Sequence, residues 1–254
     1  MEILNIIFIF IVGTIFGSFY NVVGYRTPKG KSIISPPSHC PNCNHKLKAL
    51  DLIPILSYLI GKGKCRYCNK KISLFYPFFE TLTGILFVLT YISFGFNINI
   101  IIPITFISML IIVIISDYKF MIIPDSILLT FSLIIIVEIL LIYGPIILLK
   151  HLLSAILAFL TMWALKKLGD FLFKKESMGG GDIKLLGTFG LVIGYPMAIL
   201  SIFLASIIAL PPSIITLKDN DDHIIPFGPF LAIAAIIIIL AQIDFNILTN
   251  LFKI

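Results

Sequence analysis

The sequence predicts an all-α polytopic membrane protein of about eight transmembrane helices, with a small zinc-ribbon-like domain inserted between the first two. The first observation is composition: of 254 residues 59% are hydrophobic and 13% charged, with a mean hydropathy of +1.08. Soluble domains are about 45–50% apolar and about 25% charged. The second is a series of long apolar runs, and the third is that all four cysteines lie in one polar stretch. Together they exclude disordered, collagenous and simple soluble enzyme classes.

Each transmembrane helix needs about 20 apolar residues. The candidate spans are residues 3–23, 77–94, 98–116, 126–143, 146–165, 183–193, 197–217 and 227–247. The run at 183–193 is short and stops at Gly194-Tyr195-Pro196, so it is either a half-helix or continuous with its neighbour. These are continuous apolar runs rather than the alternation of a β-barrel. Residues 3–23 lack a basic flank and a small-residue cleavage site, so we expect a retained helix and not a signal peptide.

The placement of Lys and Arg predicts the orientation in the membrane. Ten of the nineteen basic residues lie between Arg26 and Lys71. If this insert is cytoplasmic, alternation of the spans leaves only Lys150 and Lys253 on the outer side, as the positive-inside rule requires. We therefore expect a multi-pass protein of the cytoplasmic (inner) membrane. Basic residues beside spans more often set topology than bind nucleic acid, so we expect the lipid bilayer and no nucleic acid as partner.

The polar insert holds two C-x-x-C motifs, separated by 21 residues: Cys40-Pro41-Asn42-Cys43 and Cys65-Arg66-Tyr67-Cys68. This separation is one residue beyond the typical zinc-ribbon range of about 15–20. Four thiolates complete a tetrahedral Zn²⁺ site without the neighbouring His39 or His45. Disulfides are disfavoured because the cytoplasm is reducing, and a redox C-x-x-C does not normally come in two copies. The spacing predicts structural zinc.

Carboxylates at membrane depth are candidates for function because burying them is costly. For Glu80, Glu138 and Asp244 we favour a paired or interface-facing carboxylate over catalysis. Asp117 ends one apolar run and Asp182 begins another, and the topology puts both at the cytoplasmic border. Two aspartates at one depth on different helices can converge on one water molecule.

A glycine triplet, Gly179-Gly180-Gly181, directly precedes Asp182. Glycine adopts backbone conformations closed to other residues and permits close approach of a substrate chain. The alternatives are a flexible loop or an anion-binding helix N-terminus. Combined with Asp117, the triplet suggests an aspartyl protease within a membrane.

Several motifs, in order along the chain, resemble those of type IV prepilin peptidases. They are Gly17-Ser18-Phe19-Tyr20-Asn21, Tyr25-Arg26-Thr27-Pro28, the two C-x-x-C pairs, Asp51-Leu52-Ile53-Pro54, Ser57-Tyr58-Leu59, Gly63-Lys64-Cys65-Arg66, Asp117 with Ile123-Pro124-Asp125, Gly179-Gly180-Gly181-Asp182-Ile183-Lys184 and Ile225-Pro226-Phe227-Gly228-Pro229-Phe230. One departure is Phe75 before Tyr76-Pro77, where the family often has arginine.

The resemblance implies an intramembrane aspartyl endopeptidase that cleaves the leader of prepilins and pseudopilins after a glycine, on the cytoplasmic side. It further implies N-methylation of the new N-terminal residue with S-adenosylmethionine. By motif, Asp117 and Asp182 are the catalytic pair, and the supporting residues are Gly179, Gly180, Gly181, Lys184 and Asp125. No glycine-rich turn after a strand reveals a site for S-adenosylmethionine, so residues 24–75 are its default location.

We expect three domains: a first transmembrane helix at 1–23, a cytoplasmic four-cysteine zinc-binding domain at 24–75 and a transmembrane peptidase domain at 76–254. Three alternatives remain open at this point. A transporter or channel also has interrupted spans and buried carboxylates, but no repeated halves are visible here. A zinc-stabilised membrane assembly factor needs no chemistry, and a peptidase need not be a methyltransferase.

Overall fold

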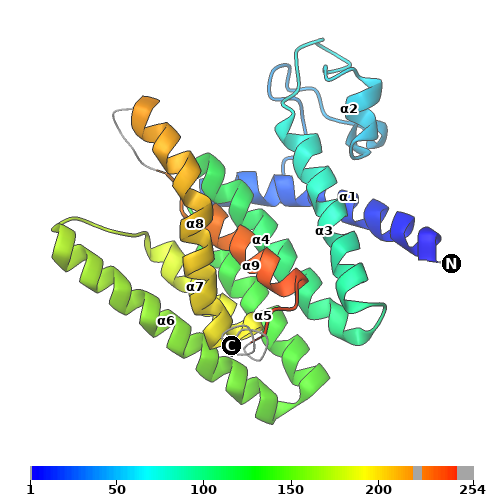
Figure 1. Ribbon diagram of the computed structural model, residues 1–254. Helices are drawn as coiled ribbons and strands as arrows, with labels where there is room; N and C mark the ends of the chain where they lie inside the picture. Colours follow the sequence, from blue (N-terminus) through cyan, green and yellow to red (C-terminus); the bar gives the residue numbers. More distant parts are fainter. Residues whose placement is uncertain (1, 220–224, 245–254) are drawn as a thin grey trace. The chain divides into compact units, whose positions relative to one another are not determined.

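The computed structural model describes residues 2–219 and 225–244, and the all-α expectation is confirmed for them. Their regular structure is helical, apart from two isolated β-bridges in the insert. Figure 1 shows the helices in chain order. The α-helices are α1 (Glu2–Arg26), α2 (Leu56–Ile60), α3 (Phe75–Phe94), α4 (Ile101–Phe120), α5 (Asp125–Tyr143), α6 (Pro145–Phe173), α7 (Gly180–Ile193), α8 (Tyr195–Asp219) and α9 (Gly228–Leu240). The 3-10 segments are Thr27–Lys29, Ala49–Leu52 and Ile98–Ile100.

Each of the eight expected apolar runs contains a helix, but eight spanning helices are not confirmed. Within the described residues six stretches are long and apolar enough to cross a membrane: Glu2–Lys29, Phe75–Phe94, Ile98–Phe120, Asp125–Tyr143, Pro145–Phe173 and Tyr195–Ile215. The helices α7 and α9 have 14 and 13 residues there. At about 1.5 Å per residue each covers about 20 Å, less than the roughly 30 Å of a bilayer core. Residues 245–247 of the last expected span, and Lys253, lie outside the described residues.

The chain divides into two compact units, Met1–Gly95 and Phe96–Ile254. The first contains α1, α3 and the cysteine-bearing insert between them, and the second contains α4 to α9. The multi-pass membrane character is shared by both, since each contributes apolar helices of spanning length.

In the first unit, small residues let α1 and α3 pack backbone against backbone, and the two helices cross in Figure 1. A Cβ added at Gly13 would lie 2.8 Å from the Cα of Gly84. One added at Gly17 would lie 2.9 Å from the Cα of Glu80. This close contact brings the start of α3 against the last turns of α1.

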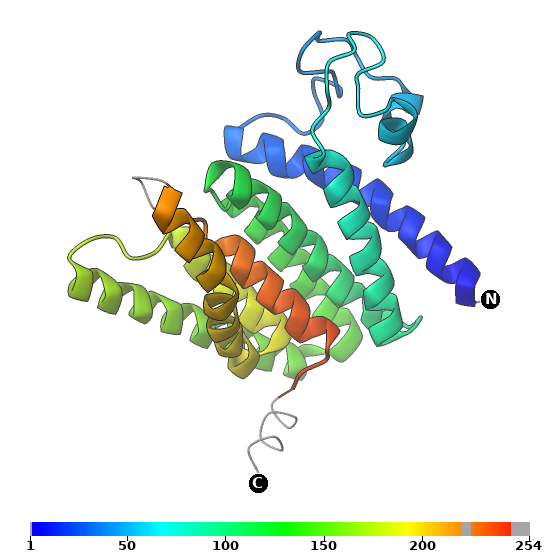
Figure 2. The same ribbon diagram turned by 45° about the horizontal axis from the view of Figure 1, so that its top comes forward.

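In the second unit the core is built around α4, in which every residue from 106 to 117 is buried. Helix α4 packs against α5, α7 and α9, and Figures 1 and 2 both show α4 and α9 side by side. The fully buried rings of Phe106 on α4 and Phe189 on α7 meet edge to face, with centroids 5.6 Å apart. Asp117 lies in the last turn of α4 and Asp182 in the first turn of α7, so both aspartates are at ends of core helices.

Candidate active site

The two aspartates singled out in the sequence come together in the second unit. Asp117 is 6% exposed and Asp182 is 8% exposed. Asp117 lies close enough for a charge on its carboxyl group to interact with the carboxyl group of Asp182. Two carboxyl groups therefore share one buried site although 65 positions separate them in the sequence (182 minus 117).

The chain turns sharply just after Asp117. Met121 adopts a left-handed conformation with φ of 52°, and its N–H donates to the carbonyl of Asp117 at 2.8 Å. The Ser116 hydroxyl donates to the carbonyl of Ile122 at 2.5 Å, which closes the turn. Pro124 then precedes the first residue of α5, a place where its missing N–H costs no helical hydrogen bond.

Glycines allow three elements to meet at this turn. A Cβ at Gly228, the first residue of α9, would lie 2.6 Å from Oδ2 of Asp117. A Cβ at Gly181 would lie 2.8 Å from the Cβ of Ile123 in the turn after α4. Neither distance is tolerable for a real side chain, so only glycine permits this approach of α7 and α9 to the end of α4.

Backbone N–H groups hold both carboxylates. The N–H of Gly228 donates to Asp117, and the N–H of Gly179 donates to Asp182. Gly228 was part of a motif in the sequence, but its contact with Asp117 was not predicted. The sequence shows only a Gly-Pro pair at the start of an apolar run. Such a pair predicts where a helix begins, but it does not predict which residue that helix end will contact.

One oxygen of the pair lacks a partner. Among the described residues, Oδ1 of Asp182 is buried and accepts no hydrogen bond. Buried polar atoms are nearly always paired, so such an oxygen calls for a water molecule or a substrate group. The carboxyl group of Asp117 is close enough to interact electrostatically with Asp182, so the site is suited to binding and activating water.

The supporting residues Lys184 and Asp125 form an ion pair near the catalytic candidates. The Nζ of Lys184 lies 2.7 and 2.6 Å from the two carboxylate oxygens of Asp125. The side chains are 49% and 68% exposed, so the pair contributes about 1 kcal/mol at most. Its effect is to tie the second turn of α7 to the start of α5. Gly180 has open space around it.

The other carboxylates considered in the sequence differ from this pair. Glu138 accepts a hydrogen bond from the Thr105 hydroxyl at 2.7 Å, and Glu80 accepts one from the Ile55 backbone at 2.8 Å. Asp244 is exposed. The paired-carboxylate interpretation therefore fits Glu80, whereas Glu138 is paired through one oxygen only, because its Oε2 is buried without a hydrogen-bond partner among the described residues.

The four cysteines form a candidate metal site in the first unit. Their sulfur atoms all lie within 4.8 Å of one another, and all four thiols are free. The sulfurs of Cys40 and Cys68 are 3.9 Å apart. Tetrahedral Zn²⁺ with Zn–S bonds of about 2.3 Å places its sulfur ligands about 3.8 Å apart. The cluster therefore has the size that such an ion requires.

The two C-x-x-C motifs adopt the same local structure. The N–H of Cys40 donates to the carbonyl of His45 at 3.0 Å, and that of Cys65 donates to the carbonyl of Lys70 at 2.8 Å. Asn44 and Asn69 occupy matching left-handed positions, with φ of 55° and 56°. Isolated bridges close each turn, but no β-hairpin forms in the described insert. The likeness to a zinc ribbon is therefore not confirmed, because single bridges replace its strands.

Backbone N–H donors favour the ionised form of Cys40, one of the four candidate zinc ligands. Burial works against ionisation of Cys40, but the N–H groups of Cys43 and Asn42 outweigh it and lower the pKa of the thiol to about 7. At Cys68 the N–H of Lys70 favours the thiolate, yet burial and the neighbouring sulfurs raise the pKa to about 11. A bound cation would relieve this competition, since metals bind the thiolate form.

An acidic residue fixes the second C-x-x-C motif against the rest of the insert. Asp51 accepts hydrogen bonds from the Lys48 N–H at 3.1 Å and the Tyr67 hydroxyl at 2.9 Å, and Arg66 lies 3.5 Å away. Burial opposes ionisation, but these partners together lower the pKa of Asp51. Because Tyr67 and Arg66 lie between the second pair of cysteines, this network orients two of the four sulfurs.

Comparisons with known proteins place the chain in a family. A model described as the bacterial peptidase A24 N-terminal domain matches residues 11–94, and the model of the type IV leader peptidase family matches residues 104–214. A protein of Bacillus subtilis (strain 168) named prepilin leader peptidase/N-methyltransferase is 37% identical over 247 residues, covering 92% of each chain. The chain belongs to the type IV leader peptidase family. The resemblance seen in its motifs is confirmed.

Other members of the type IV leader peptidase family carry the same name. The relative from Neisseria gonorrhoeae is 31% identical over 91% of this chain and 89% of its own length. The relative from Legionella pneumophila is 34% identical over 81% of this chain and 72% of its own length. No solved structure matches the chain.

Zinc content tests the cysteine cluster. Freshly purified, unchelated protein should contain one zinc ion per chain by elemental analysis. Replacing any one of Cys40, Cys43, Cys65 or Cys68 by serine should lower that content and loosen the insert, because metal binding and folding are linked. His39→Ala is the matched control, since four sulfurs already complete the tetrahedron, and it should retain the metal. Wild-type protein without zinc would contradict the assignment.

Proposed function

We propose that this chain is a membrane endopeptidase that removes the leader of type IV prepilins and pseudopilins after a glycine, and then N-methylates the new N-terminal residue. The supporting observation is the buried Asp117–Asp182 pair, assembled from two helices at glycine-only contacts. The names of its relatives support both activities. The proposed location is the inner membrane, with the aspartates at the cytoplasmic face.

Peptide hydrolysis follows from two carboxyl groups that interact. Like charges held close do not both ionise, so the pair holds one proton between them. The ionised aspartate takes a proton from water, whose oxygen attacks the scissile carbonyl carbon while the protonated aspartate polarises the carbonyl oxygen. The tetrahedral intermediate collapses as the C–N bond breaks and a proton passes to the leaving amine.

The surrounding residues hold the two aspartates in position. The N–H groups of Gly228 and Gly179 hold one oxygen of each carboxyl group, and Oδ1 of Asp182 is left to bind water or the carbonyl group. The exposed Lys184–Asp125 pair keeps the start of α7 in register with α5. Hydrolysis by this route needs no metal, so the proposed zinc has a structural role.

The proposed substrate lies partly in the membrane and partly in the cytoplasm. Its apolar segment lies among the spans while its basic leader stays in the cytoplasm, which puts the scissile bond at the level of the aspartates. The proposed division of labour is a first helix at 1–23, the zinc-binding domain at 24–75 and the peptidase domain at 76–254. S-adenosylmethionine supplies an activated methyl group, and the zinc-binding domain is where we expect it to bind.

Conservative changes in the pair test the peptidase. Asp117→Asn and Asp182→Asn should each abolish leader cleavage, because neither amide can take or give the required proton, while the protein still inserts in the membrane. Cleavage is measured by mass spectrometry of a candidate prepilin. Asp125→Asn, outside the buried pair, should have a smaller effect. A single asparagine variant that cleaves at a near wild-type rate would refute the assignment and favour a binding scaffold.

A glycine substitution tests the geometry. Gly228→Ala places a methyl group 2.6 Å from Oδ2 of Asp117, too close for van der Waals contact, so the carboxylate must move. A displacement of about 1 Å can cost about a hundredfold in rate, and we expect a loss of that order. Gly187→Ala is the matched control on α7, since its added Cβ would lie no closer than 3.4 Å to its neighbours. Equal cleavage rates for the two variants would contradict the proposed contact.

Different substitutions should remove methylation and leader cleavage. Serine in place of Cys40 or Cys65 should reduce methyl transfer more than hydrolysis, because hydrolysis uses aspartates on other helices and no metal. The Asp117→Asn variant should still methylate a precleaved substrate with a free N-terminus. Both are followed with methyl-labelled S-adenosylmethionine. Loss of methylation in Asp117→Asn would mean one shared site, and no methyl transfer by the wild type would leave a peptidase only.

A further inference from the structure

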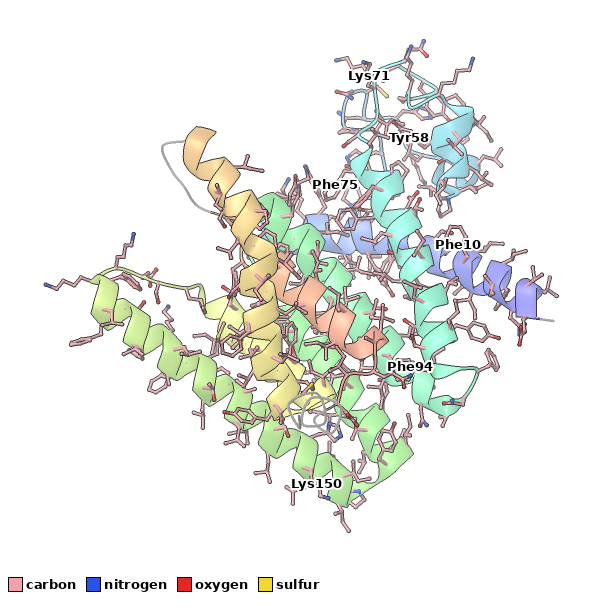
Figure 3. All side chains as sticks on the ribbon, viewed as in Figure 1. Phe10, Tyr58, Lys71, Phe75, Phe94 and Lys150 are labelled. Atoms are coloured by element: carbon pink, nitrogen blue, oxygen red, sulfur yellow. The ribbon has the colours of Figure 1, made fainter. Side chains whose placement is uncertain are left out.

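A cavity of about 260 Å³ lies within the first unit, where the end of α1, the start of α3 and the insert meet. Its walls include Ser18 and Asn21 from α1, Glu80 from α3, and Asp51 and Tyr58 from the insert. Figure 3 labels Tyr58 on α2 and Phe75 at the first residue of α3, which marks two of these three elements. The volume is close to the lower end of the range for small-molecule sites, about 300–1,000 Å³.

Asn21, one of the residues that line the cavity, has an acceptor without a donor. The side chain is 3% exposed, and its amide nitrogen donates to the carbonyl of Tyr76 at 3.2 Å, which fixes the orientation of the amide. Within residues 2–219 and 225–244 its Oδ1 has no hydrogen-bond partner. A buried amide oxygen in this state is satisfied by a ligand that carries N–H or O–H groups.

Glu80 gives the cavity a buried carboxyl group. The residue is 9% exposed, and its Oε2 accepts the N–H of Ile55 at 2.8 Å. The Ser18 hydroxyl also donates to this carboxylate. Ile55 has φ of 62°, a strained value for a β-branched residue, so the contact with Glu80 holds the insert in a costly conformation at the cavity wall.

Two other charged groups at the cavity, Asp51 and Arg26, are already engaged. Asp51 is bound to Tyr67, Arg66 and the Lys48 N–H, and Arg26 donates to the carbonyls of Ser32 and Pro36 at 3.2 and 2.7 Å. Glu80 is therefore the carboxylate placed to compensate a positive charge on a ligand. Tyrosine rings also line the cavity, and aromatic rings bind both flat bases and organic cations.

We propose that this cavity binds S-adenosylmethionine, with Glu80 facing the sulfonium group and Oδ1 of Asn21 accepting a hydrogen bond from the nucleoside or amino-acid portion. The methyl donor offers what the cavity demands: a positive charge, an aromatic base, and N–H and O–H donors. This inference rests on the proposed methyltransferase activity. It extends the expected location beyond residues 24–75 to the membrane helices α1 and α3.

During the proposed methyl transfer one positive charge stays near Glu80, first on the sulfur of the donor and then on the nitrogen of the product. The amine nitrogen of the cleaved substrate forms a bond to the methyl carbon as the carbon–sulfur bond breaks, and the bonding electrons remain on sulfur. The products are the neutral thioether S-adenosylhomocysteine and a methylated ammonium, which releases its proton to water. A carboxylate beside the sulfur and the nitrogen compensates the charge in both states.

Ligands of different charge separate this role of Glu80 from a structural one. Full-length protein in nanodiscs is titrated with S-adenosylmethionine, with sinefungin, which carries an amine in place of the methylated sulfur, and with S-adenosylhomocysteine, whose sulfur is neutral. Glu80→Gln keeps an oxygen that accepts the Ile55 N–H but loses the charge. It should weaken the two cationic ligands about tenfold or more while the neutral thioether changes little. Asn21→Leu should weaken all three.

Glu138→Gln is the matched control, because it neutralises another hydrogen-bonded carboxylate in an apolar helix, and it should bind all three ligands as the wild type does. Leader cleavage by each variant reports whether it has folded. If the wild type binds and transfers methyl groups but Glu80→Gln and Asn21→Leu bind normally, the cavity is refuted while the methyltransferase stands. If the wild type neither binds these ligands nor methylates, both are refuted. An equal loss for cationic and neutral ligands in Glu80→Gln would overturn the charge-compensating role.

Discussion

The structure of the second unit depends on bringing two buried carboxyl groups together at the ends of core helices. Burial and mutual repulsion both oppose two negative charges at one site. The chain offsets this cost with backbone dipoles: Gly228 opens α9 and donates to Asp117, and Gly179 precedes α7 and donates to Asp182. Helix N-termini stabilise negative charge, so two of them converge where it is needed.

This convergence requires the absence of side chains at particular positions. Gly228 and Gly181 press against Asp117 and Ile123, and a Cβ at either glycine would occupy space that is already filled. The first unit uses the same device, since Gly13 and Gly17 allow α1 and α3 to approach and thereby form the wall of a cavity. In both units, the polar groups with potential chemistry lie where glycine permits two helices to come unusually close.

Much of this could be predicted from the sequence because the signals are local. Four cysteines in two C-x-x-C pairs predict a cluster, and aspartates that end and begin apolar runs predict a shared depth. The short α7 was one of the two possibilities that the run at 183–193 left open, but the short α9 was not predicted, because an apolar run indicates a helix but not its exact length. The roles of Gly228, Asn21 and Glu80 arise from contacts between helices distant in sequence, for which no spacing rule exists.

The central claim is that Asp117 and Asp182 act as one unit, and a double-mutant cycle tests it most directly. Leader cleavage is measured for the wild type, Asp117→Asn, Asp182→Asn and the double variant, all in the same membrane preparation with long single-turnover incubations. Residues that act as a unit show strongly non-additive losses, so the double variant should retain the same residual rate as each single variant. Losses that multiply in the double variant would show two independent contributions and contradict the account.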